Sequence, residues 1–437
     1  MNLISQEIQS MSGEILCPGD KSISQRILII GSFLNCDMEI DGFLDSEDPN
    51  STLRALNEIG ASIKKEQNKV FLTKRNISFH EPSNDLDLGN SGTGARLILG
   101  LIAGLALKSK IVGDSSLSNR PMLRVIKPLI EMGASIESSN GTLPIHTLDS
   151  KISNNYKYDM PIASAQVKSC LLLAALASKN NISITEPKIT RDHTERMIDY
   201  FGGDISFGKK ENAGEIELKS NKLLSKSSYK VPGDFSSAAF IIVAALISCQ
   251  SELLIKNVGL NKTRSGLIEI LKLMGADIDI HNHKTESNEQ VGDILVRSSN
   301  LIGIDVPENI IPNIIDEIPI LSIAAAFADG TTKITNASEL RVKESDRLNA
   351  ISDGLSKLNI SHEIFEDGIE ITGTKQKIDS KDMINSFGDH RIAMSFLIAG
   401  IRSNNGICVM NCKNIETSFP NFMNIMNSLG MKINENT

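Results

Sequence analysis

The sequence predicts an α/β protein built from six copies of one structural unit. The first observation behind this prediction is an apolar segment of about three helical turns, which follows a polar or charged turn and occurs six times. The copies follow one another at intervals of roughly 71–80 residues and begin at Ser22, Thr93, Ser164, Ser236, Asp316 and Asp389. Because these segments are apolar on nearly all sides, they are typical of buried helices.

The second observation is a recurring helix end that is followed by a short strand. A glycine, or Asn359 in the degenerate copy, fits the left-handed position that ends a helix. The alternating stretches that follow indicate strands. Each unit is therefore expected to contain strands, one buried helix and one amphipathic helix. The recurring segments are 57–63, 130–136, 200–206, 271–278, 427–433 and the degenerate 356–364.

The two halves of the chain resemble each other. A Pro-Gly-Asp motif opens the first copy at Pro18 and the fourth copy at Pro232, and 232 − 18 = 214 residues is close to three units. We therefore expect a first domain over 18–233 and a second, discontinuous domain over 1–17 plus 234–437. Pro-Gly is a suitable hinge, since proline fixes the chain path and glycine permits unusual angles. The cleft between two such domains is the expected place for an active site.

Composition excludes several classes of function. Hydrophobic residues make up 41% and charged residues 22% of the 437 residues, as in ordinary globular proteins. A net charge of −8 argues against nucleic-acid binding, because a phosphate backbone favours a basic surface. No apolar stretch is long enough to span a bilayer, and the N-terminus has no signal-peptide pattern, so we expect a cytoplasmic protein without a membrane partner.

The cysteines predict neither a disulfide framework nor a metal site. None of the six forms a C-x-x-C pair, and Cys408 and Cys412 lack a second pair that would complete a zinc site. Cys170 and Cys249 are expected to lie in buried helices as free thiols.

Cations recur where the apolar helices begin. The positive end of a helix dipole disfavours them there, while free N–H groups at the same end bind anions. Each cation alone could extend to solvent, but the set indicates an anionic, phosphorylated ligand that several helix ends hold together. The cations are Lys21, Arg26, Arg96, Lys168, His390 and Arg391.

Several charged motifs occur in a specific order. GDKSISQR (19–26) is followed by LGNSGTGAR (88–96), NRPM (119–122), SAQVKS (164–169) and RDHTERM (191–197). NKTR (261–264), RVKESDR (341–347), GDHR (388–391) and TSFPNF (417–422) complete the series. In this order the motifs closely resemble those of the 5-enolpyruvylshikimate-3-phosphate (EPSP) synthase family, and SAQVKS, RDHTERM and NKTR are similar to its class II branch.

The resemblance implies transfer of the enolpyruvyl group of phosphoenolpyruvate to the 5-hydroxyl of shikimate 3-phosphate, with release of phosphate, in the shikimate pathway. It implies a two-domain enolpyruvyl transferase-like fold of six βαβαββ units, three per domain, which closes on the substrates. It implies neither an organic cofactor nor a metal, and we expect a monomer.

The resemblance also assigns roles to residues. Arginine suits both substrates because its planar fork grips phosphate and carboxylate groups. Arg96 matches a position in the site with a less direct role. Phosphoenolpyruvate is expected to contact Lys21, Asn90, Gly92, Thr93, Arg120, Gln166, Arg347 and Arg391. Shikimate 3-phosphate is expected to contact Lys21, Ser22, Arg26, Ser164, Ala165, Gln166, Arg191, Asp316 and Lys343.

The reaction needs an acid for the methylene carbon of the enol and a base for the attacking hydroxyl. Glu344 and Lys21 are the candidates for proton transfer to and from the carbon, and Asp316 is the candidate base. A carboxylate among cations is normally ionised, so Glu344 needs desolvation or a proton relay to act as an acid. Asp316 also fits the N-cap position of a helix, and both roles are compatible.

Two positions distinguish this chain within the family. Thr417 replaces a lysine that contacts phosphoenolpyruvate in the better-known branch. Gly92 is retained where some class II members have alanine, which narrows the pocket against the inhibitor glyphosate. We therefore expect glyphosate to inhibit this protein.

The sequence leaves two alternative functions open. UDP-N-acetylglucosamine enolpyruvyl transferase shares the fold and the donor substrate, but that family carries a reactive cysteine shortly before its matching Arg-Pro. The stretch 114–119 before Arg120 contains none. The second alternative is a non-catalytic scaffold that binds phosphorylated ligands without turnover.

Overall fold

The computed structural model describes residues 1–66, 69–74, 78–210, 213–380 and 382–436. The chain forms two compact units, each with its own hydrophobic core. Unit 1 comprises Met1–Pro18, Gly233–Lys284 and Gln290–Thr437. Unit 2 comprises Gly19–Pro232 together with Thr285–Glu289. The expected second domain included Thr285–Glu289, whereas the structure places this hairpin turn in unit 2, where Glu289 Oε1 lies 2.7 Å from His193 Nδ1.

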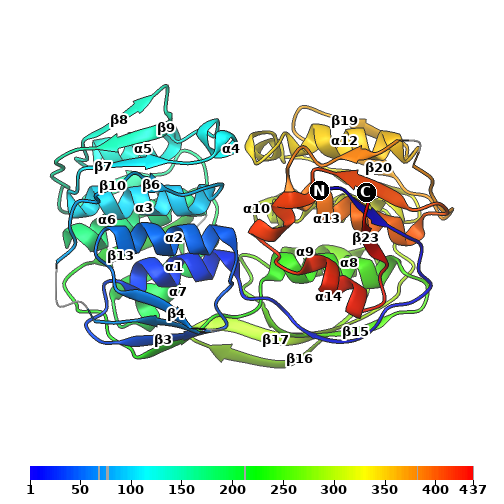
Figure 1. Ribbon diagram of the computed structural model, residues 1–437, viewed down its shortest axis with the longest axis horizontal. Coiled ribbons are helices and arrows are strands. Elements are labelled where there is room, and N and C mark those ends of the chain that lie inside the picture. The colour runs from blue at the N-terminus through cyan, green and yellow to red at the C-terminus, as the bar shows by residue number, and fades with distance from the viewer. Residues whose placement is uncertain (67–68, 75–77, 211–212, 381, 437) are drawn as a thin grey trace. The chain divides into compact units, whose positions relative to one another are not determined.

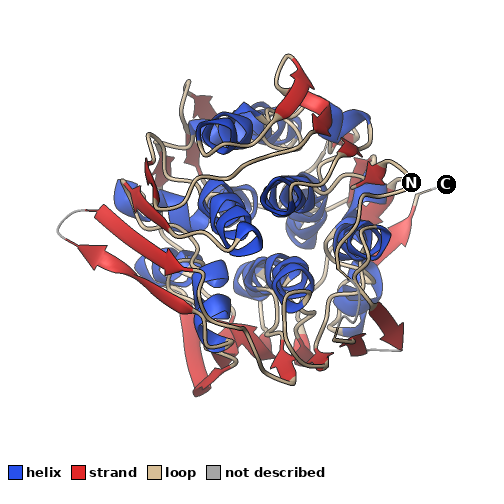
Figure 2. Cartoon of the chain, turned by 90° about the vertical axis from the view of Figure 1, so that its left-hand side faces the viewer, coloured by secondary structure: helices blue, strands red, loops and turns tan. Residues whose placement is uncertain are grey.

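Figure 2 faces unit 2, in which most helices lie inside and the strands lie at the periphery. The helices of unit 2 are α1 (Lys21–Gly31), α2 (Glu47–Glu58), α3 (Gly92–Leu105), α4 (Ser115–Ser118), α5 (Leu123–Glu131), α6 (Ala165–Ser178) and α7 (His193–Tyr200) (Figure 1). Those of unit 1 are α8 (Phe235–Ile247), α9 (Gly266–Leu273), α10 (Ile311–Ile314), α11 (Ile318–Ala326), α12 (Arg347–Lys357), α13 (His390–Ala399) and α14 (Phe422–Ser428). Short 3-10 helices in unit 1 are η1 (Glu308–Ile310), η2 (Ser338–Val342), η3 (Gly400–Arg402) and η4 (Cys412–Thr417).

The described strands of unit 2 form three sheets. Their spatial orders are β14-β3-β5-β4, β6-β7-β9-β8 and β10-β11-β13-β12. In the second and third sheets the first two strands are parallel and the other pairs are antiparallel, as a βαβαββ unit requires. The strands are β3 (Met38–Asp41), β4 (Ile63–Glu66), β5 (Lys69–Leu72), β6 (Leu86–Asp87), β7 (Ser109–Val112), β8 (Ile136–Ser139), β9 (Thr142–Thr147), β10 (Tyr156–Asp159), β11 (Ile182–Glu186), β12 (Asp204–Lys210), β13 (Ala213–Lys219) and β14 (Ser228–Lys230).

Three further sheets of described strands belong to unit 1, apart from the hairpin turn between β16 and β17. Their orders are β16-β17-β15-β2, β18-β20-β19 and β21-β22-β1-β23. The middle sheet lacks a first strand among the described residues, and two isolated parallel bridges, Ile302 to Asp329 and Asp305 to Lys333, lie beside it. The strands are β1 (Leu3–Ser5), β2 (Ser12–Leu16), β15 (Glu252–Gly259), β16 (Asp277–Glu286), β17 (Glu289–Arg297), β18 (Thr331–Ile334), β19 (His362–Ile364), β20 (Ile369–Thr372), β21 (Ile384–Asn385), β22 (Ile407–Met410) and β23 (Ile433–Glu435).

The sequence repeat is thereby confirmed as a structural repeat. Each predicted apolar segment contains one inner helix: α1, α3 and α6 in unit 2, and α8, α11 and α13 in unit 1. All six predicted helix ends contain a residue with positive φ, namely Gly60, Gly133, Gly202, Gly275, Asn359 and Gly430. Left-handed glycine or asparagine at these sites stops each outer helix and turns the chain into the next strand.

The cysteines follow the prediction in part. Burial raises the pKa of the Cys170 thiol in α6 to about 12, so this thiol is protonated at neutral pH. The placement of Cys249 was wrong, because α8 ends at Ile247 and Cys249 is exposed. No single helix among the described residues is long and apolar enough to cross a membrane, although a pair bent by 116° (Glu308–Ile314 with Ile318–Ala326) passes by length and composition.

Small residues let α3 and α6 pack closely. A Cβ atom at Gly100 would lie 2.2 Å from the carbonyl oxygen of Cys170, and one at Gly104 would lie 2.4 Å from that of Ala174. Real carbon and oxygen atoms do not approach this closely, so a side chain at either position would force the two helices apart.

We therefore predict that Gly100→Ala destabilises unit 2 by about 1–3 kcal/mol through overpacking, despite the better helix propensity of alanine. Urea unfolding followed by circular dichroism would measure the change. Gly202→Ala is the control, because a Cβ there meets nothing within 4 Å and only its positive φ opposes the substitution. Equal or smaller destabilisation by Gly100→Ala would contradict the close packing of α3 and α6.

Candidate active site

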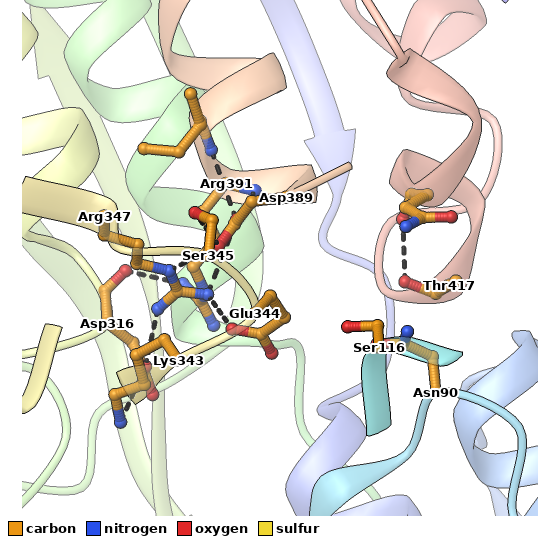
Figure 3. Close-up of polar contacts among 12 residues, drawn as sticks. Asn90, Ser116, Asp316, Lys343, Glu344, Ser345, Arg347, Asp389, Arg391 and Thr417 are labelled. Atoms are coloured by element: carbon orange, nitrogen blue, oxygen red, sulfur yellow. Dashed lines mark hydrogen bonds and ion pairs between the residues drawn. The ribbon is translucent and has the colours of Figure 1, made fainter. Parts of the chain in front are cut away.

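Arg347 lies at the centre of a cluster of ion pairs in unit 1 (Figure 3). It is the first residue of α12, and its side chain is only 1% exposed. Its Nε lies 2.8 Å from Asp389 Oδ2, and its Nη1 lies 3.2 Å from Asp316 Oδ1. Its Nη2 lies 2.5 Å from Glu344 Oε2. Three carboxylates thus surround one buried guanidinium.

These carboxylates keep the Arg347 guanidinium positively charged. Burial alone would lower the pKa of the guanidinium, but attraction to Asp389, Glu344 and Asp316 outweighs burial and holds the pKa above its ordinary value. The Asp389 side chain is fully buried, whereas those of Asp316 and Glu344 are 15% and 21% exposed. An incoming anion would therefore compete with Asp316 and Glu344 for the guanidinium, while the buried Asp389 stays bound to Nε.

Asp389 also caps the inner helix α13. Its Oδ1 accepts hydrogen bonds from the backbone N–H groups of Arg391 at 2.9 Å and Ile392 at 3.4 Å. Asp20 and Asp234 cap α1 and α8 in the same way. The sequence predicted that a ligand alone offsets the cations at the helix ends. The protein itself supplies part of that negative charge through these N-cap aspartates.

Asp316 does not cap a helix, so the N-cap interpretation was wrong. The N-cap position of α11 is Glu317, and no side-chain hydrogen bond caps that end. The Asp316 carboxylate instead faces Arg347 and lies 3.7 Å from Lys343 Nζ, which is also 3.4 Å from Glu339. The Asp316 carbonyl accepts a hydrogen bond from Arg391 Nη1 at 2.9 Å. The structure therefore brings the five predicted site residues of unit 1 together.

In unit 2, Asn90 links the predicted Arg120 to the turn before α4. Arg120 Nη2 donates to Asn90 Oδ1 at 2.6 Å and Nη1 donates to the Asn90 carbonyl at 3.3 Å. The Asn90 amide donates to Asp114 Oδ2 at 2.7 Å. Lys21, at the start of α1, forms an ion pair of 2.9 Å with Asp48. Arg120 and Lys21 thus each have an oxygen partner that holds the side chain.

Gln166 joins the N-terminal ends of α3 and α6. Its Oε1 accepts from Arg96 Nη1 at 2.7 Å, and its Nε2 donates to Thr93 Oγ1 at 2.9 Å. Gly92 lies in the same turn, where a Cβ would be 3.0 Å from Arg120 Nη1 and 3.2 Å from Arg96 Nη1. Only a glycine leaves both guanidinium groups where they are.

Arg26 is buried in unit 2. Its Nη1 donates to the Ser22 carbonyl at 3.0 Å and its Nε donates to Thr194 Oγ1 at 2.9 Å. Burial lowers the pKa of Arg26 to about 10, against the pull of Glu195, so the side chain is still charged at neutral pH. Ser164 caps α6, Ala165 begins it, and Arg191 lies two residues before α7.

Lys168 does not face a ligand, and its inclusion among the ligand-binding cations was wrong. Its side chain is 1% exposed and lies 2.9 Å from both Glu186 and Glu195. It also donates to the Thr190 carbonyl at 3.1 Å, next to Arg191. Burial lowers the pKa of Lys168, but the two carboxylates outweigh burial and raise it, so the ammonium group persists.

Sequence reasoning missed the carboxylates that hold the cations. Asp48, Asp114 and Glu317 lie in no motif that was given a role. The available signal was charge balance, because buried cations need anionic partners. The sequence also did not predict the contact of Thr417, whose hydroxyl donates a hydrogen bond to the Asn414 carbonyl at 2.7 Å (Figure 3). In the described part of the chain, no group of three or more His, Cys, Asp or Glu residues could hold a metal ion.

The repeated α/β units, with cations at the N-terminal ends of their inner helices, define the enolpyruvyl transferase-like class that the motifs predict. Comparisons with known proteins agree. A family model described as EPSP synthase (3-phosphoshikimate 1-carboxyvinyltransferase) matches residues 5–426. The chain therefore belongs to the EPSP synthase family, which confirms the resemblance and the prediction of a transferase.

Relatives and solved structures match over the whole chain. A 3-phosphoshikimate 1-carboxyvinyltransferase of Legionella pneumophila (strain Lens) is 45% identical over 100% of this chain and 99% of its own. One from Petrotoga mobilis (strain DSM 10674 / SJ95) is 48% identical over 96% of this chain and 98% of its own. The solved EPSP synthase of Acinetobacter baumannii superposes with a TM-score of 0.86 at 39% identity, with both chains covered completely. The predicted fold class is therefore confirmed.

Removal of the Lys168 charge should destabilise the protein. Lys168→Met keeps the side-chain volume but leaves Glu186 and Glu195 buried without their cation, so we expect a loss of about 3–5 kcal/mol in the free energy of unfolding. Chemical denaturation would measure it.

The matched control is Lys210→Met, which removes a lysine from an exposed pair with Glu215. That change should stay within about 0.5 kcal/mol. Similar stabilities of the two variants would show that the Lys168 cluster contributes no more than a surface ion pair.

Proposed function

We propose that this chain transfers the enolpyruvyl group of phosphoenolpyruvate to the 5-hydroxyl of shikimate 3-phosphate, giving 5-enolpyruvylshikimate 3-phosphate and phosphate. The observation that carries the proposal is the buried Arg347 among Asp389, Glu344 and Asp316, in a chain that belongs to the EPSP synthase family. A scaffold that only binds anions would need the cation but not two partly exposed carboxylates beside it.

The two units are proposed to be the two substrate-binding domains. The phosphoenolpyruvate contacts would come from both units, namely Lys21, Asn90, Gly92, Thr93, Arg120 and Gln166 of unit 2 and Arg347 and Arg391 of unit 1. The shikimate 3-phosphate contacts would be Lys21, Ser22, Arg26, Ser164, Ala165, Gln166 and Arg191 of unit 2 and Asp316 and Lys343 of unit 1. We further propose a cytoplasmic monomer.

The proposed reaction begins when the 5-oxygen attacks C2 of the enol while a proton is added to its methylene carbon. Asp316 is the proposed base, and Glu344 or Lys21 would transfer the proton to carbon and later remove one. Departure of phosphate and loss of that proton restore the double bond. Negative charge develops on the leaving phosphate, and preorganised cations such as Arg347 and Arg391 would stabilise it.

Phosphate release by the purified protein tests the function. We expect release only when phosphoenolpyruvate and shikimate 3-phosphate are both present, and none when UDP-N-acetylglucosamine is the acceptor. Release only with the nucleotide sugar would overturn the substrate assignment. No release with either acceptor would favour the binding scaffold.

A side chain at position 92 should weaken inhibition by glyphosate. We propose that glyphosate inhibits the wild-type protein, and that Gly92→Ala weakens this inhibition because the new Cβ would push against Arg120 and Arg96. A loss of about 1.4 kcal/mol in inhibitor binding would raise the inhibition constant about tenfold.

Inhibition constants measured against phosphoenolpyruvate for both proteins would check this. Ala95→Gly is the control, because it changes the neighbouring buried position without adding an atom near either arginine. Strong glyphosate tolerance of the wild-type protein would contradict the proposal.

A further inference from the structure

The Ser236 hydroxyl is a junction between two arginines in unit 1. Ser236 lies in the first turn of α8 and is only 4% exposed. Its Oγ accepts a hydrogen bond from Arg391 Nη2 at 3.0 Å and another from Arg264 Nη2. It donates a hydrogen bond to Glu317 Oε1 at 2.5 Å. A hydroxyl has one donor and two acceptor sites, so all three are in use.

Glu317 fixes the direction of this hydroxyl. Its side chain is fully buried, and its two oxygens lie 2.9 and 3.1 Å from Arg264 Nη1. Its Oε1 is also 3.4 Å from Arg391 Nη1. Because the carboxylate accepts the hydrogen bond of the hydroxyl group, the oxygen lone pairs of Ser236 point to the two guanidinium groups.

The charges explain why two arginines can meet at one oxygen. Arg264 and Arg391 would repel each other in a buried place unless anions offset them. Glu317 contacts both, and Asp234 Oδ1 lies 3.8 Å from Arg264 Nη2 while it caps α8. The network therefore connects the beginnings of the three inner helices α8, α11 and α13.

We propose that Ser236, supported by Glu317 and Arg264, is a positioning residue that orients the Arg391 guanidinium for the anionic groups of phosphoenolpyruvate; this inference rests on the proposed function. Arg391 has three fixed acceptors, namely the Asp316 carbonyl, Glu317 Oε1 and Ser236 Oγ. Ser236 holds Nη2 alone among these, so its loss frees one arm of the guanidinium. A cation that is already ordered loses less conformational entropy when the ligand binds.

Steady-state kinetics of Ser236→Ala test this role. We expect KM for phosphoenolpyruvate to rise about tenfold, as the loss of a hydrogen bond to a charged group would give. KM for shikimate 3-phosphate should stay within about twofold, and kcat should fall less than KM rises, because Ser236 orients a binding group and does not transfer a proton. Ser236→Thr, which keeps the hydroxyl, should restore KM.

Ser322→Ala is the matched control. Ser322 is a fully buried serine of the inner helix α11, and its hydroxyl donates only to the Ile318 carbonyl of the same helix. If Ser236→Ala behaves like Ser322→Ala, the positioning role is wrong. It is also wrong if both KM values and kcat worsen together with a lowered melting temperature, because that pattern indicates a structural role. Should Ser236→Ala not fold, Ser236→Cys takes its place with the same expectations, because a thiol is a weak hydrogen-bond acceptor and the variant leaves Glu317 in place.

Calorimetric titration with phosphoenolpyruvate in the presence of shikimate 3-phosphate separates this inference from the proposed function. A wild-type protein that binds phosphoenolpyruvate without releasing phosphate would contradict the function, yet a tenfold weaker affinity of Ser236→Ala would still support the positioning role. Equal affinities of the two proteins would overturn the positioning role. A wild-type protein that does not bind phosphoenolpyruvate would overturn both.

Discussion

The arrangement of both units depends on cations that buried carboxylates hold at the beginnings of the inner helices. A buried charge is tolerated only with a partner, and removal of that partner is strongly destabilising. Asp389 meets this need in unit 1 because one carboxylate caps α13 and binds Arg347. Glu186 and Glu195 meet it for Lys168 in unit 2. The Asp389 cap fixes where α13 begins, and each of these pairs holds its cation in place.

In unit 1 the ion pairs of Arg347 would also prepare the proposed site for anions. Arg347 has one fully buried partner, Asp389, and two partners at the edge of the cluster, Asp316 and Glu344. In the proposed function, a substrate anion would take the place of the outer carboxylates without exposing the guanidinium to water. The displaced carboxylates would then lie beside the substrate, where the proposed acid and base are needed. Binding and proton transfer would thus use one set of side chains.

The sequence predicted the repeat well because the repeat depends on local signals. Apolar segments and left-handed residues such as Gly60 and Asn359 act within a few positions of themselves, and the structure confirms both. The partners of the cations depend on long-range contacts and were not predictable in this way. Lys168 was misassigned because Glu186 and Glu195 are distant in the sequence, and Asp316 because the helix begins one residue later than its N-cap role requires.

A crystal structure with phosphoenolpyruvate and shikimate 3-phosphate bound, whether captured as substrates, intermediate or products, would test the roles proposed for Arg347 and Arg391. We expect an anionic oxygen of the donor or of its released phosphate within hydrogen-bond distance of Arg347 and Arg391. Asp389 should still bind Arg347 Nε, while Glu344 or Asp316 has moved away from the guanidinium. An anion bound elsewhere, with all three carboxylates still on Arg347, would show that Arg347 does not bind the substrate anion.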